Sequence, residues 1–546
     1  MKNNSADTTP LLSVQNLTIS LPAGFDRPHA VDNVNFDLNA GEILCMIGES
    51  GSGKSVTASA IMGLLAPSIY VKSGSIKLKG TELIGLPEDK LLDMRGRVVS
   101  VVFQDPLSAL NPLMTIGEQI REVFDTHNVL ATSARDARVL ALLEEVGLPN
   151  PELIRHQYPF RLSGGQRQRV MIAMALALDP DVLIADEPTT ALDVTTQAQI
   201  LRLIRDLQKR KNIGVIFVTH DVGVVAEMAT RVIVMEKGVQ VEEGTTDDVL
   251  NNPVHPYTQR LIAAVPRLRV EARPVQDAGD NILDVKNVSK TFVASSGGLF
   301  GKKRVLQAVN NVSFTLKRGE TLGVVGESGS GKSTLGRLVM KLIDADGGEI
   351  LLDGKDIRPL AEKDFRPLRS RIQMVFQDPY SSLNPRHTIG TALTVGPVAH
   401  GMPVTEARDK ARALLDRVGL QASAYDRYPH EFSGGQRQRV GIARALMFDP
   451  EIIIADEAVS ALDVSIQAQI LDLLDTIQKE NKLSLIFITH DLLVASQICD
   501  KILVMHRGSV VEIGEPMQIF FDPQQDYTRQ LVSAIPGITR QLTAAA

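Results

Sequence analysis

The sequence contains only two cysteines, Cys45 and Cys499, among its 546 residues. Two cysteines are too few for a cysteine-rich metal site or a disulfide framework, and this scarcity favours a reducing compartment. The longest unbroken apolar run is Val170–Leu178, whereas a membrane-spanning helix needs about 20 apolar residues. The start of the chain also lacks the apolar centre of a secretory signal peptide. We therefore do not expect an integral membrane protein, although a protein that sits on a membrane partner remains possible.

An excess of either charge is also lacking, since 58 Lys and Arg against 64 Asp and Glu give a formal net charge of −6. This weak acidic balance disfavours a protein built mainly to coat nucleic acid, although local basic patches remain possible. Hydrophobic residues make up 44% of the chain, which is enough for several cores. At about 150 residues per domain, the length suggests three to four domains.

What the sequence does contain is one series of motifs that is written twice in the same order. Glu187 recurs as Glu457 and His220 recurs as His490, in both cases 270 residues later. A repeat this long indicates a duplicated domain and not a solenoid unit. The other repeated segments are GESGSGKS at 48–55 and 326–333, SGGQRQRV at 163–170 and 433–440, and the tails PYTQRLIAAVP at 256–266 and DYTRQLVSAIP at 526–536.

The repeat predicts two domains, at 1–268 and 281–546, joined by a surface linker at 269–280. The linker sequence is polar and contains Pro274 and Gly279, as is typical of connecting segments.

Each half is predicted to be an α/β domain. Apolar segments at 42–47, 182–185 and 215–218 predict short buried strands. Between them, apolar residues recur with helical spacing before a glycine in both halves: Val139, Leu142, Leu143, Val146 and Gly147, then Ala411, Leu414, Leu415, Val418 and Gly419. Strands that alternate with helices favour a mostly parallel sheet, here with an added helical part.

The segment GESGSGKS fits the phosphate-loop pattern G-x-x-x-x-G-K-[ST]. Its glycines let successive backbone N–H groups point at phosphate oxygens, and the following helix adds the positive end of its dipole. The lysine would reach the β/γ-phosphates and the last serine would bind Mg²⁺. A chance Gly-Ser loop is disfavoured because the pattern occurs twice, each time after an apolar segment. The predicted nucleotide-binding residues are Gly48, Ser50, Gly51, Gly53, Lys54, Ser55, Gly326, Ser328, Gly329, Gly331, Lys332 and Ser333.

An Asp-Glu pair ends an apolar run in each half, and a histidine follows the next apolar run. An Asp at the carboxyl end of a core strand can hold Mg²⁺, and the adjacent Glu can orient or deprotonate the attacking water. We expect the histidine to contact the γ-phosphate. An isolated Asp-Glu pair or a lone histidine would be a solvated strand end, but the upstream phosphate loop favours catalysis. These residues are Asp186, Glu187 and His220, and Asp456, Glu457 and His490.

The repeated SGGQ is predicted to begin a helix and to form a second anion site, because a serine hydroxyl and two glycines precede the helix. A simple helix cap is the alternative. One domain could hardly bring both anion sites to the same phosphate, so we expect the SGGQ of one half to face the nucleotide of the other. The residues are Ser163, Gly164, Gly165 and Gln166, and Ser433, Gly434, Gly435 and Gln436.

The ordered set of phosphate loop, glutamine, SGGQ, Asp-Glu and histidine resembles the ATP-binding cassette (ABC) ATPases. The segments VFQDPLSALNP at 102–112, VFQDPYSSLNP at 375–385 and NNPVHPYTQRLIAAVP at 251–266 are similar to those of oligopeptide/dipeptide importer ATPases. The resemblance implies an α/β fold of two tandem P-loop NTPase nucleotide-binding domains, each with a RecA-like core and a helical subdomain. It also implies ATP and Mg²⁺ as cofactors, with Ser55, Gln104, Asp186, Ser333, Gln377 and Asp456 at the metal.

This resemblance further implies a role in import. The chain would hydrolyse ATP in two composite sites between its halves, and so power import of a peptide or peptide-like solute. A separate pair of transmembrane permease subunits and a solute-binding protein would be its partners. It would lie peripherally on the cytoplasmic face of the bacterial inner membrane, bind no nucleic acid, and dock on the permeases through 104–112 and 377–385.

Three features of the sequence differ from the family pattern or leave alternatives open. Phe292 aligns with an aromatic residue that stacks on adenine, whereas the first half has Leu21 there, with Phe25 as a substitute or a turn-packing residue. The insertion at 297–304 is expected to be a solvated loop, with a membrane or permease contact as the alternative. Related subunits often carry a cysteine-rich motif, but Cys499 stands alone, so we expect no iron–sulfur cluster.

A different function would be that of a soluble double-cassette ATPase that acts on ribosomes or nucleic acid. Such proteins usually have a long charged linker between their cassettes. The short, non-basic joint and the net charge of −6 count against this alternative.

Overall fold

The computed structural model describes residues 9–190, 192–269, 279–295, 303–378, 382–460, 462–538 and 542. The chain forms two compact units, Met1–Val265 and Pro266–Ala546. Within the described ranges, every helix is too short or too polar to span a bilayer. Most of the expected linker, 270–278, lies outside the described residues, so the boundaries at 1–268, 269–280 and 281–546 stay predictions.

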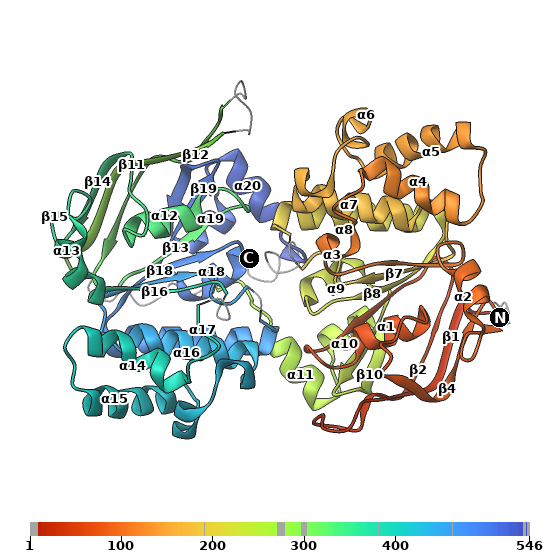
Figure 1. The fold of residues 1–546 in the computed structure, drawn as a ribbon, viewed down its shortest axis with the longest axis horizontal. Coiled ribbons are helices and arrows are strands. Elements are labelled where there is room, and N and C mark those ends of the chain that lie inside the picture. Colours follow the sequence, from red (N-terminus) through yellow and green to blue (C-terminus); the bar gives the residue numbers. More distant parts are fainter. Residues whose placement is uncertain are drawn as a thin grey trace. The chain divides into compact units, whose positions relative to one another are not determined.

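The first unit alternates strands with helices, as the motif spacing predicts (Figure 1). Its strands are β1 Leu12–Ser20, β2 His29–Leu38, β3 Ile43–Ile47, β4 Tyr70–Leu78, β5 Thr81–Glu82, β6 Val99–Val102, β7 Val182–Asp186, β8 Gly214–Val218, β9 Arg231–Glu236 and β10 Val239–Thr245. Its helices are α1 Lys54–Ile61, α2 Glu88–Met94, α3 Pro106–Ala109, α4 Ile116–Thr126, α5 Thr132–Glu145, α6 Pro151–Ile154, η1 Pro159–Arg161, α7 Gly164–Ala175, α8 Val194–Lys211, α9 Val222–Met228, α10 Thr246–Asn251 and α11 Pro256–Ala263.

The strands of the first unit form one sheet in the order β5-β4-β1-β2-β10-β9-β3-β8-β7-β6. Strands β6, β7, β8, β3 and β9 pair in parallel, whereas β1, β2, β4 and β5 form an antiparallel region. The three segments predicted as buried strands become β3, β7 and β8, so the predicted parallel core is confirmed. Parallel pairing brings the carboxyl ends of these strands to one edge of the sheet.

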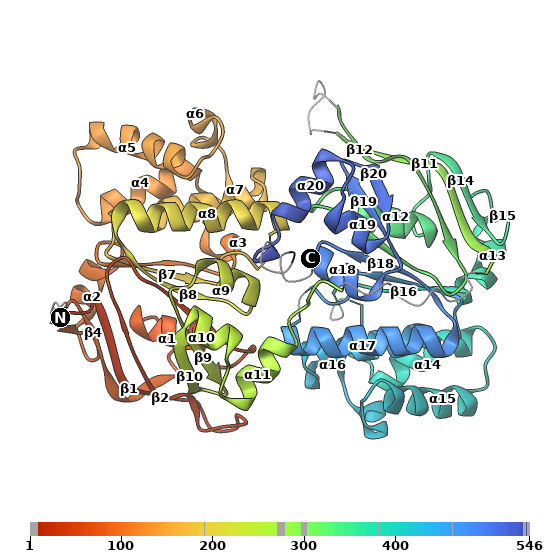
Figure 2. The same cartoon turned by 180° about the vertical axis from the view of Figure 1, so that it is seen from behind.

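The two faces of this core pack against different layers. Leu183 and Ala185 of β7 face the cluster that contains residues of α4, α5, α7 and α8. Val182 and Ile184, which alternate with them, face the cluster of α1 and the antiparallel strands. Both views show α1 and α7 on different sides of β7 and β8 (Figures 1 and 2).

The helical segment predicted between the motifs is confirmed as α5. Its apolar face is buried at Val139, Leu142 and Leu143, and the helix ends at Glu145. Gly147 follows with a φ of 69°, in the left-handed region that favours glycine at a helix end. The second unit repeats this geometry in α15, which ends before a glycine of the same conformation.

The second unit repeats the order of the strands. Its strands are β11 Asn281–Ser295, β12 Lys303–Lys317, β13 Thr321–Val325, β14 Gly347–Leu352, β15 Lys355–Asp356, β16 Ile372–Val375, β17 Ile452–Asp456, β18 Ser484–Thr489, β19 Lys501–His506 and β20 Ser509–Gly514. Its helices are α12 Lys332–Val339, α13 Glu362–Phe365, η2 Arg366–Ser370, α14 Ile389–Ala399, α15 Val404–Arg417, η3 Ala422–Asp426, η4 Pro429–Glu431, α16 Gly434–Leu446, α17 Val464–Asn481, α18 Leu492–Ile498, α19 Pro516–Phe521 and α20 Asp526–Ser533.

The second unit differs from the first in how its strands divide into sheets. A parallel core in the order β16-β17-β18-β13-β19-β20 is separate from the antiparallel sheet β12-β11-β14-β15. In the first unit, one parallel bridge between Val239 and Asp32 joins the corresponding regions. Strands β11 and β12 pair as far as Ser295 and Lys303. Of the predicted insertion at 297–304, residues 297–302 lie outside the described residues.

Candidate active site

In each unit the phosphate-loop motif connects a core strand to a helix, as predicted. The loop of the first unit joins β3 to α1, and a Cβ atom on Gly48 would lie 2.2 Å from the carbonyl oxygen of Met235. Gly53 has a φ of 103° and precedes the first residue of α1. Gly326 and Gly331 occupy the same positions in the second unit. The predicted residues Ser50 and Gly51 and their counterparts Ser328 and Gly329 lie within these loops.

The lysine of each loop is buried and donates to the loop's own carbonyl oxygens. Lys54 is only 4% exposed, and its Nζ lies 2.8 Å from the carbonyl oxygen of Gly48 and 2.9 Å from that of Glu49. Lys332 makes the two equivalent contacts at 2.8 Å each. An ammonium group at the mouth of a glycine-rich loop can turn from these neutral carbonyls to the negative oxygens of a phosphate.

The predicted serine–aspartate pairs are brought together in both units. The hydroxyl of Ser55 donates to Oδ1 of Asp186 at 2.9 Å, and that of Ser333 donates to Oδ1 of Asp456 at 2.8 Å. Burial raises the pKa of both aspartates, although the serine hydroxyls oppose that shift. A hydroxyl beside a partly buried carboxylate is a donor set that suits Mg²⁺, whose charge would offset the cost of burying the carboxylate.

The general-base candidate of the first unit, Glu187, is the centre of a hydrogen-bonded cluster. Its carboxylate accepts from Nε2 of Gln104 at 3.0 Å and from the hydroxyl of Thr190 at 2.8 Å, and lies 3.3 Å from Nδ1 of His220. Burial favours the neutral acid, but the contacts with His220, Thr190 and Lys54 outweigh it and lower the pKa of Glu187. The carboxylate is therefore held ionised, as the acceptor of a water proton must be.

The second unit repeats this cluster around Glu457. Its carboxylate accepts from Nε2 of Gln377 at 2.7 Å and lies 3.7 Å from Nδ1 of His490. Burial again opposes ionisation, but the contacts with His490, Lys332 and Ser460 outweigh it and lower the pKa of Glu457. The pKa of His490 is raised, because the hydrogen bond and negative charge of Glu457 outweigh the effect of burial.

Both glutamates adopt an unusual backbone conformation. Glu187 has a φ of 45° and Glu457 has a φ of 46°, in the left-handed region that residues other than glycine seldom occupy. Such conformations gather at functional sites, where the surrounding structure holds them in place. The backbone N–H groups of Glu187 and Glu457 donate to the carbonyl oxygens of Val218 and Ile488, both at 2.9 Å.

The glutamines expected at the metal lie elsewhere in this conformation. Gln104 and Gln377 contact the glutamate carboxylates and not the serine–aspartate pairs. The structure therefore joins each glutamine to the predicted general base, while its role at Mg²⁺ stays a prediction.

SGGQ begins a helix in both units, as predicted. The hydroxyl of Ser163 accepts from the backbone N–H of Gln166 at 3.3 Å, and the Gln166 side chain accepts from the N–H of Ser163 at 3.0 Å. Ser433 and Gln436 form the same reciprocal cap. These contacts fit the helix-cap alternative, and they leave the predicted nucleotide contact untested.

The second glycine of SGGQ also has a packing role. A Cβ on Gly165 would lie 2.3 Å from a methyl carbon of Thr196 in α8, and one on Gly435 would lie 2.4 Å from Ile466 in α17. Gly164 and Gly434 have more room, since the nearest atoms to a Cβ there lie at 3.6 and 3.8 Å.

Phe292, the predicted adenine-stacking residue, lies on β11 with 41% of its surface exposed. The ammonium of Lys290 lies 5.8 Å from the centre of its ring. Phe25 is also exposed, whereas Leu21 is only partly exposed and packs against the core of the first unit. The ring of Phe292 is therefore accessible, and its contact with adenine stays a prediction.

The repeated tails contribute a contact that sequence reasoning missed. The hydroxyl of Tyr257 accepts from the backbone N–H of Glu49 at 3.0 Å, and that of Tyr527 accepts from the N–H of Glu327 at 3.3 Å. The available signal was the repetition of a tyrosine in PYTQRL and DYTRQL. Thr190, which holds Glu187, was also missed.

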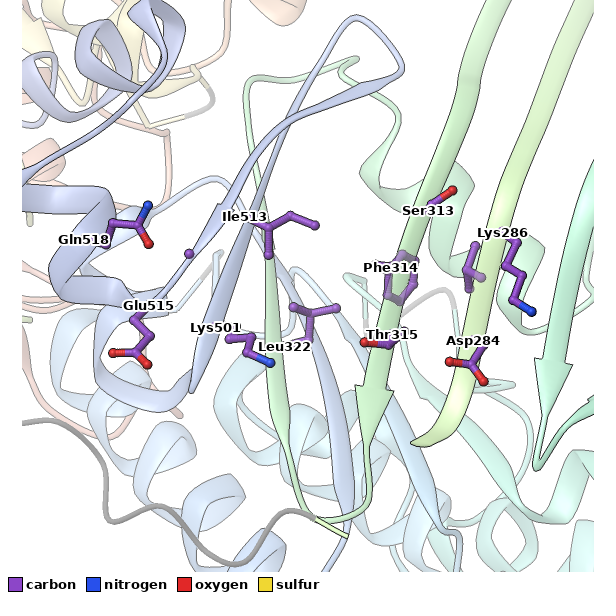
Figure 3. Close-up of a pocket in the computed structure, with 12 residues that line it drawn as sticks. Asp284, Lys286, Ser313, Phe314, Thr315, Leu322, Lys501, Ile513, Glu515 and Gln518 are labelled. Atoms are coloured by element: carbon purple, nitrogen blue, oxygen red, sulfur yellow. The ribbon is translucent and has the colours of Figure 1, made fainter. Parts of the chain in front are cut away.

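The second unit contains a separate cavity of about 540 Å³ (Figure 3). It lies between β11 and β12 on one side and β19, β20 and α19 on the other. Phe314, Leu322 and Ile513 form an apolar part of its lining, together with charged residues that include Lys286 and Lys501. None of the predicted site residues is among the lining residues.

Comparison with known proteins decides the family. The model of the ABC transporter family matches residues 31–190 and 309–460, which together make up more than half of the chain. The chain belongs to the ABC transporter family. This assignment confirms the predicted resemblance and the two-cassette α/β fold, and it identifies the chain as an ATP-binding subunit with ATPase activity.

More specific similarities concern the ABC subgroup. The model of the oligopeptide/dipeptide transporter C-terminal region matches residues 241–295. The glutathione import ATP-binding protein GsiA of Escherichia coli (strain K12) is 45% identical over 98% of this chain and 91% of its own length. GsiA of Shigella boydii serotype 4 is similar to the same extent. A solved chain, cbiO1 from Clostridium perfringens, is 30% identical, covering 48% of this chain and 99% of its own, with a TM-score of 0.40.

Proposed function

We propose that this ABC ATPase powers the import of a peptide or peptide-like solute through a separate pair of membrane permease subunits. The match to the oligopeptide/dipeptide transporter region and the similarity to proteins named for glutathione import support this proposal. The alternative of action on ribosomes or nucleic acid finds no support in these relatives.

The two ATP sites would be composite. In the first, residues 48–55, Gln104, Asp186, Glu187 and His220 would be completed by 433–436. In the second, residues 326–333, Gln377, Asp456, Glu457 and His490 would be completed by 163–166. Supporting this, α7, the helix that SGGQ begins, and α1 pack against different faces of the sheet in the first unit, so this unit alone would offer its phosphate only one anion site. The proposal takes 1–268 and 281–546 as the two domains, with 269–280 as their linker.

The chemistry follows from the side chains around each glutamate. Lys54 and Lys332 would neutralise the phosphate charge, and Ser55 with Asp186, and Ser333 with Asp456, would hold Mg²⁺. When bound with ATP, Mg²⁺ supplies positive charge to the transferring phosphoryl group. The ionised Glu187 or Glu457 would accept the proton of the attacking water, with Gln104 or Gln377 and His220 or His490 orienting that carboxylate. Phe292 would stack on adenine in the second site.

Coupling to transport would use the segments that follow the two glutamines. In the first unit, Asp105 caps α3 by accepting from the backbone N–H groups of Leu107 and Ser108, and Leu107 is exposed. A short, preformed helix with an exposed leucine suits docking on a permease. The equivalent 377–385 includes 379–381, which lie outside the described residues. The chain would act at the cytoplasmic face of the bacterial inner membrane, with a solute-binding protein as a further partner.

The observation that carries the proposal is the ionised glutamate with its glutamine and histidine in both units. We expect Glu187→Gln combined with Glu457→Gln to lower ATP turnover by about 10²-fold or more, because no carboxylate remains to accept the water proton. ATP binding should persist, as measured with a fluorescent ATP analogue. Normal turnover in this variant would contradict the assignment of the base. Co-purification of permease subunits with the tagged chain tests the transport part, and ribosomes or RNA in their place would contradict it.

A further inference from the structure

The C-terminal helix of each unit reaches back to its phosphate loop. Tyr257 near the start of α11 accepts a hydrogen bond from the backbone N–H of Glu49, although 208 residues separate them. Tyr527 near the start of α20 makes the same contact with Glu327 across 200 residues. The same pair of atoms meets in two units whose surrounding sequences differ, so the contact belongs to the architecture of each unit.

A buried or partly buried carboxylate binds the turn that precedes each tyrosine and so helps to fix the position of that tyrosine. Glu242 of β10 accepts from the backbone N–H groups of Val254 at 2.8 Å and His255 at 3.0 Å, and Nδ1 of His255 accepts from the N–H of Tyr257. Burial raises the pKa of Glu242, but the Thr258 side chain and these backbone N–H groups outweigh it and lower that pKa. The turn is therefore anchored by an ionised acceptor.

The second unit has the same anchor with a different turn. Glu512 of β20 accepts from the backbone N–H groups of Gln524 at 2.8 Å and Gln525 at 3.2 Å. The carboxylate is present in both units, whereas the residues it binds change from Val-His to Gln-Gln. Because the contacts use backbone N–H groups, the turn geometry survives this change of side chains.

The rings of the two tyrosines are supported in different ways. The guanidinium of Arg260 lies 5.9 Å from the ring centre of Tyr257 and 3.6 Å from the carboxylate of Glu236. The ring of Tyr527 instead stacks on His506, with 4.0 Å between ring centres. Two different supports therefore place the same hydroxyl against the same atom of the loop.

We propose that Tyr257 and Tyr527 are positioning residues that hold the phosphate loop in the shape that binds ATP. This inference rests on the proposed function of the loops. Glu49 is held at its carbonyl oxygen by Lys54 and at its N–H by Tyr257. When the lysine turns to a phosphate, the carbonyl contact is given up while the tyrosine contact remains. The N–H of Ser52 also donates to the carbonyl oxygen of Glu49 at 3.1 Å, but Ser52 belongs to the loop itself, whereas the tyrosine is a contact that holds Glu49 from outside the loop.

The test uses the full chain with Tyr257→Phe and Tyr527→Phe together, which removes both hydroxyls and keeps both rings. We expect the Kd for a fluorescent ATP analogue and the KM for ATP to rise about fivefold, the factor that corresponds to a lost hydrogen bond of about 1 kcal/mol. The value of kcat at saturating ATP should stay within about twofold. Tyr70→Phe is the matched control, because Tyr70 is exposed on β4, and it should change neither quantity.

A second pair of substitutions tests the same contact between tyrosine and phosphate loop by changing the carboxylate that binds the preceding turn. Glu242→Gln with Glu512→Gln should raise the KM for ATP in the same direction, since each carboxylate aims a tyrosine. Unchanged Kd and KM in both sets, together with a lower unfolding temperature, would overturn the inference and leave the tyrosines a purely structural role.

A separate experiment tests whether the two loops bind ATP at all. Lys54→Ala with Lys332→Ala should abolish binding of the ATP analogue. If these lysine variants bind like the unchanged protein, the assignment of the loops fails. If they lose binding while the tyrosine variants keep it, only the role of the tyrosines is refuted.

Discussion

In the first half, the carboxylate of Glu187 accepts a hydrogen bond from the hydroxyl of Thr190 at 2.8 Å. In the second half, the residue at that place is Ser460, whose hydroxyl donates to the backbone carbonyl of Glu457 at 3.0 Å and is the smallest of the influences that lower the pKa of its carboxylate. The histidine also lies closer in the first half, at 3.3 Å against 3.7 Å. The motif residues are thus identical in the two halves, whereas the contacts that neighbouring side chains make with the glutamate differ. One chain therefore offers two versions of the same candidate site for direct comparison.

The divergence grows with distance from the motifs. In the first half, Lys79 and Asp181 form a single exposed ion pair at 3.0 Å. At the corresponding edge of the second half, four residues form a network in which both arginines contact both acids: Arg318, Arg371, Asp353 and Glu451. The catalytic chemistry allows only certain residue types at a few positions. Ion pairs at the sheet edge can be replaced by others, provided that each charged group still contacts an opposite charge.

The largest difference between the halves should appear when the supporting hydroxyls are removed. Thr190→Ala takes away a hydrogen bond to an ionised carboxylate, and we expect ATP turnover to fall about tenfold at saturating ATP. Ser460→Ala, the matched control, should change turnover by less than about twofold, because its hydroxyl donates to the backbone carbonyl and has the smallest influence on the carboxylate. Steady-state ATPase measurements on the two single variants test this expectation. Equal losses would mean that the structural difference has no functional counterpart.

The ion network predicts a second, smaller difference, in stability. The hydrogen bond from Arg371 to Glu451 at 2.9 Å and that from Arg318, against an opposing effect of burial, lower the pKa of Glu451 to about 2. Because the folded pKa lies below the unfolded one, this stabilisation is present above about pH 4.5 and is lost as the pH falls toward 2. Since the side chain is about one-third exposed, solvent screening reduces the expected contribution to about 1 kcal/mol.

Glu451→Gln should therefore destabilise the second unit at pH 7, and the difference should shrink as the pH is lowered below about 4.5. Hydrogen exchange in β16 and β17 in the presence of urea would measure it within the full chain. Asp181→Asn is the control in the first half and should cost less, because it breaks one exposed ion pair. A pH-independent effect of Glu451→Gln would show that the network acts through packing and not through charge.

Much of the fold and of the candidate site could be predicted because the decisive residues are close in sequence. The phosphate loop, the Asp186–Glu187 pair and the helix that ends before Gly147 each follow from a local pattern of a few residues. Parallel strands then bring such segments to one sheet edge, which is why Glu187 and Glu457 lie near the histidines that follow the neighbouring strands.

Contacts between residues that are far apart in the sequence could not be predicted, because they depend on the three-dimensional fold. The contact of Tyr257 with Glu49 spans 208 residues and has no local pattern. Gln104 contacts Glu187 and not the pair of Ser55 and Asp186, and this contact depends on the conformation of a loop. The bridge between Val239 and Asp32, which joins β10 to β2, and the hydrogen bond from Asn310 to Gly508 at the corresponding place in the second half depend on geometry that hydrophobic periodicity does not encode.

The cavity of the second unit offers the smallest test of how the halves diverged. At its place in the first unit, Arg231 pairs with Glu42 at 3.1 Å and Glu243 at 3.5 Å. In the second unit Lys501 pairs with Glu320 at 3.0 Å, and Ile513, which is 42% exposed, stands where the second acid would be. The second unit therefore has a shorter cation and one acid fewer at this place than the first unit.

Restoring the missing acid should therefore strengthen the second unit slightly. We expect Ile513→Glu to add about 0.5 kcal/mol of stability by giving Lys501 a second partner, since an exposed isoleucine gives up little buried area. The reverse change in the first unit, Glu243→Ile, should cost about as much, because it removes a partner of Arg231. Urea unfolding followed by hydrogen exchange in β9 and β19 would compare the two. If Ile513→Glu destabilised its unit, the isoleucine would be shown to pack across the cavity, and the open space between the sheets would belong to the architecture of the second half and not to a missing charge.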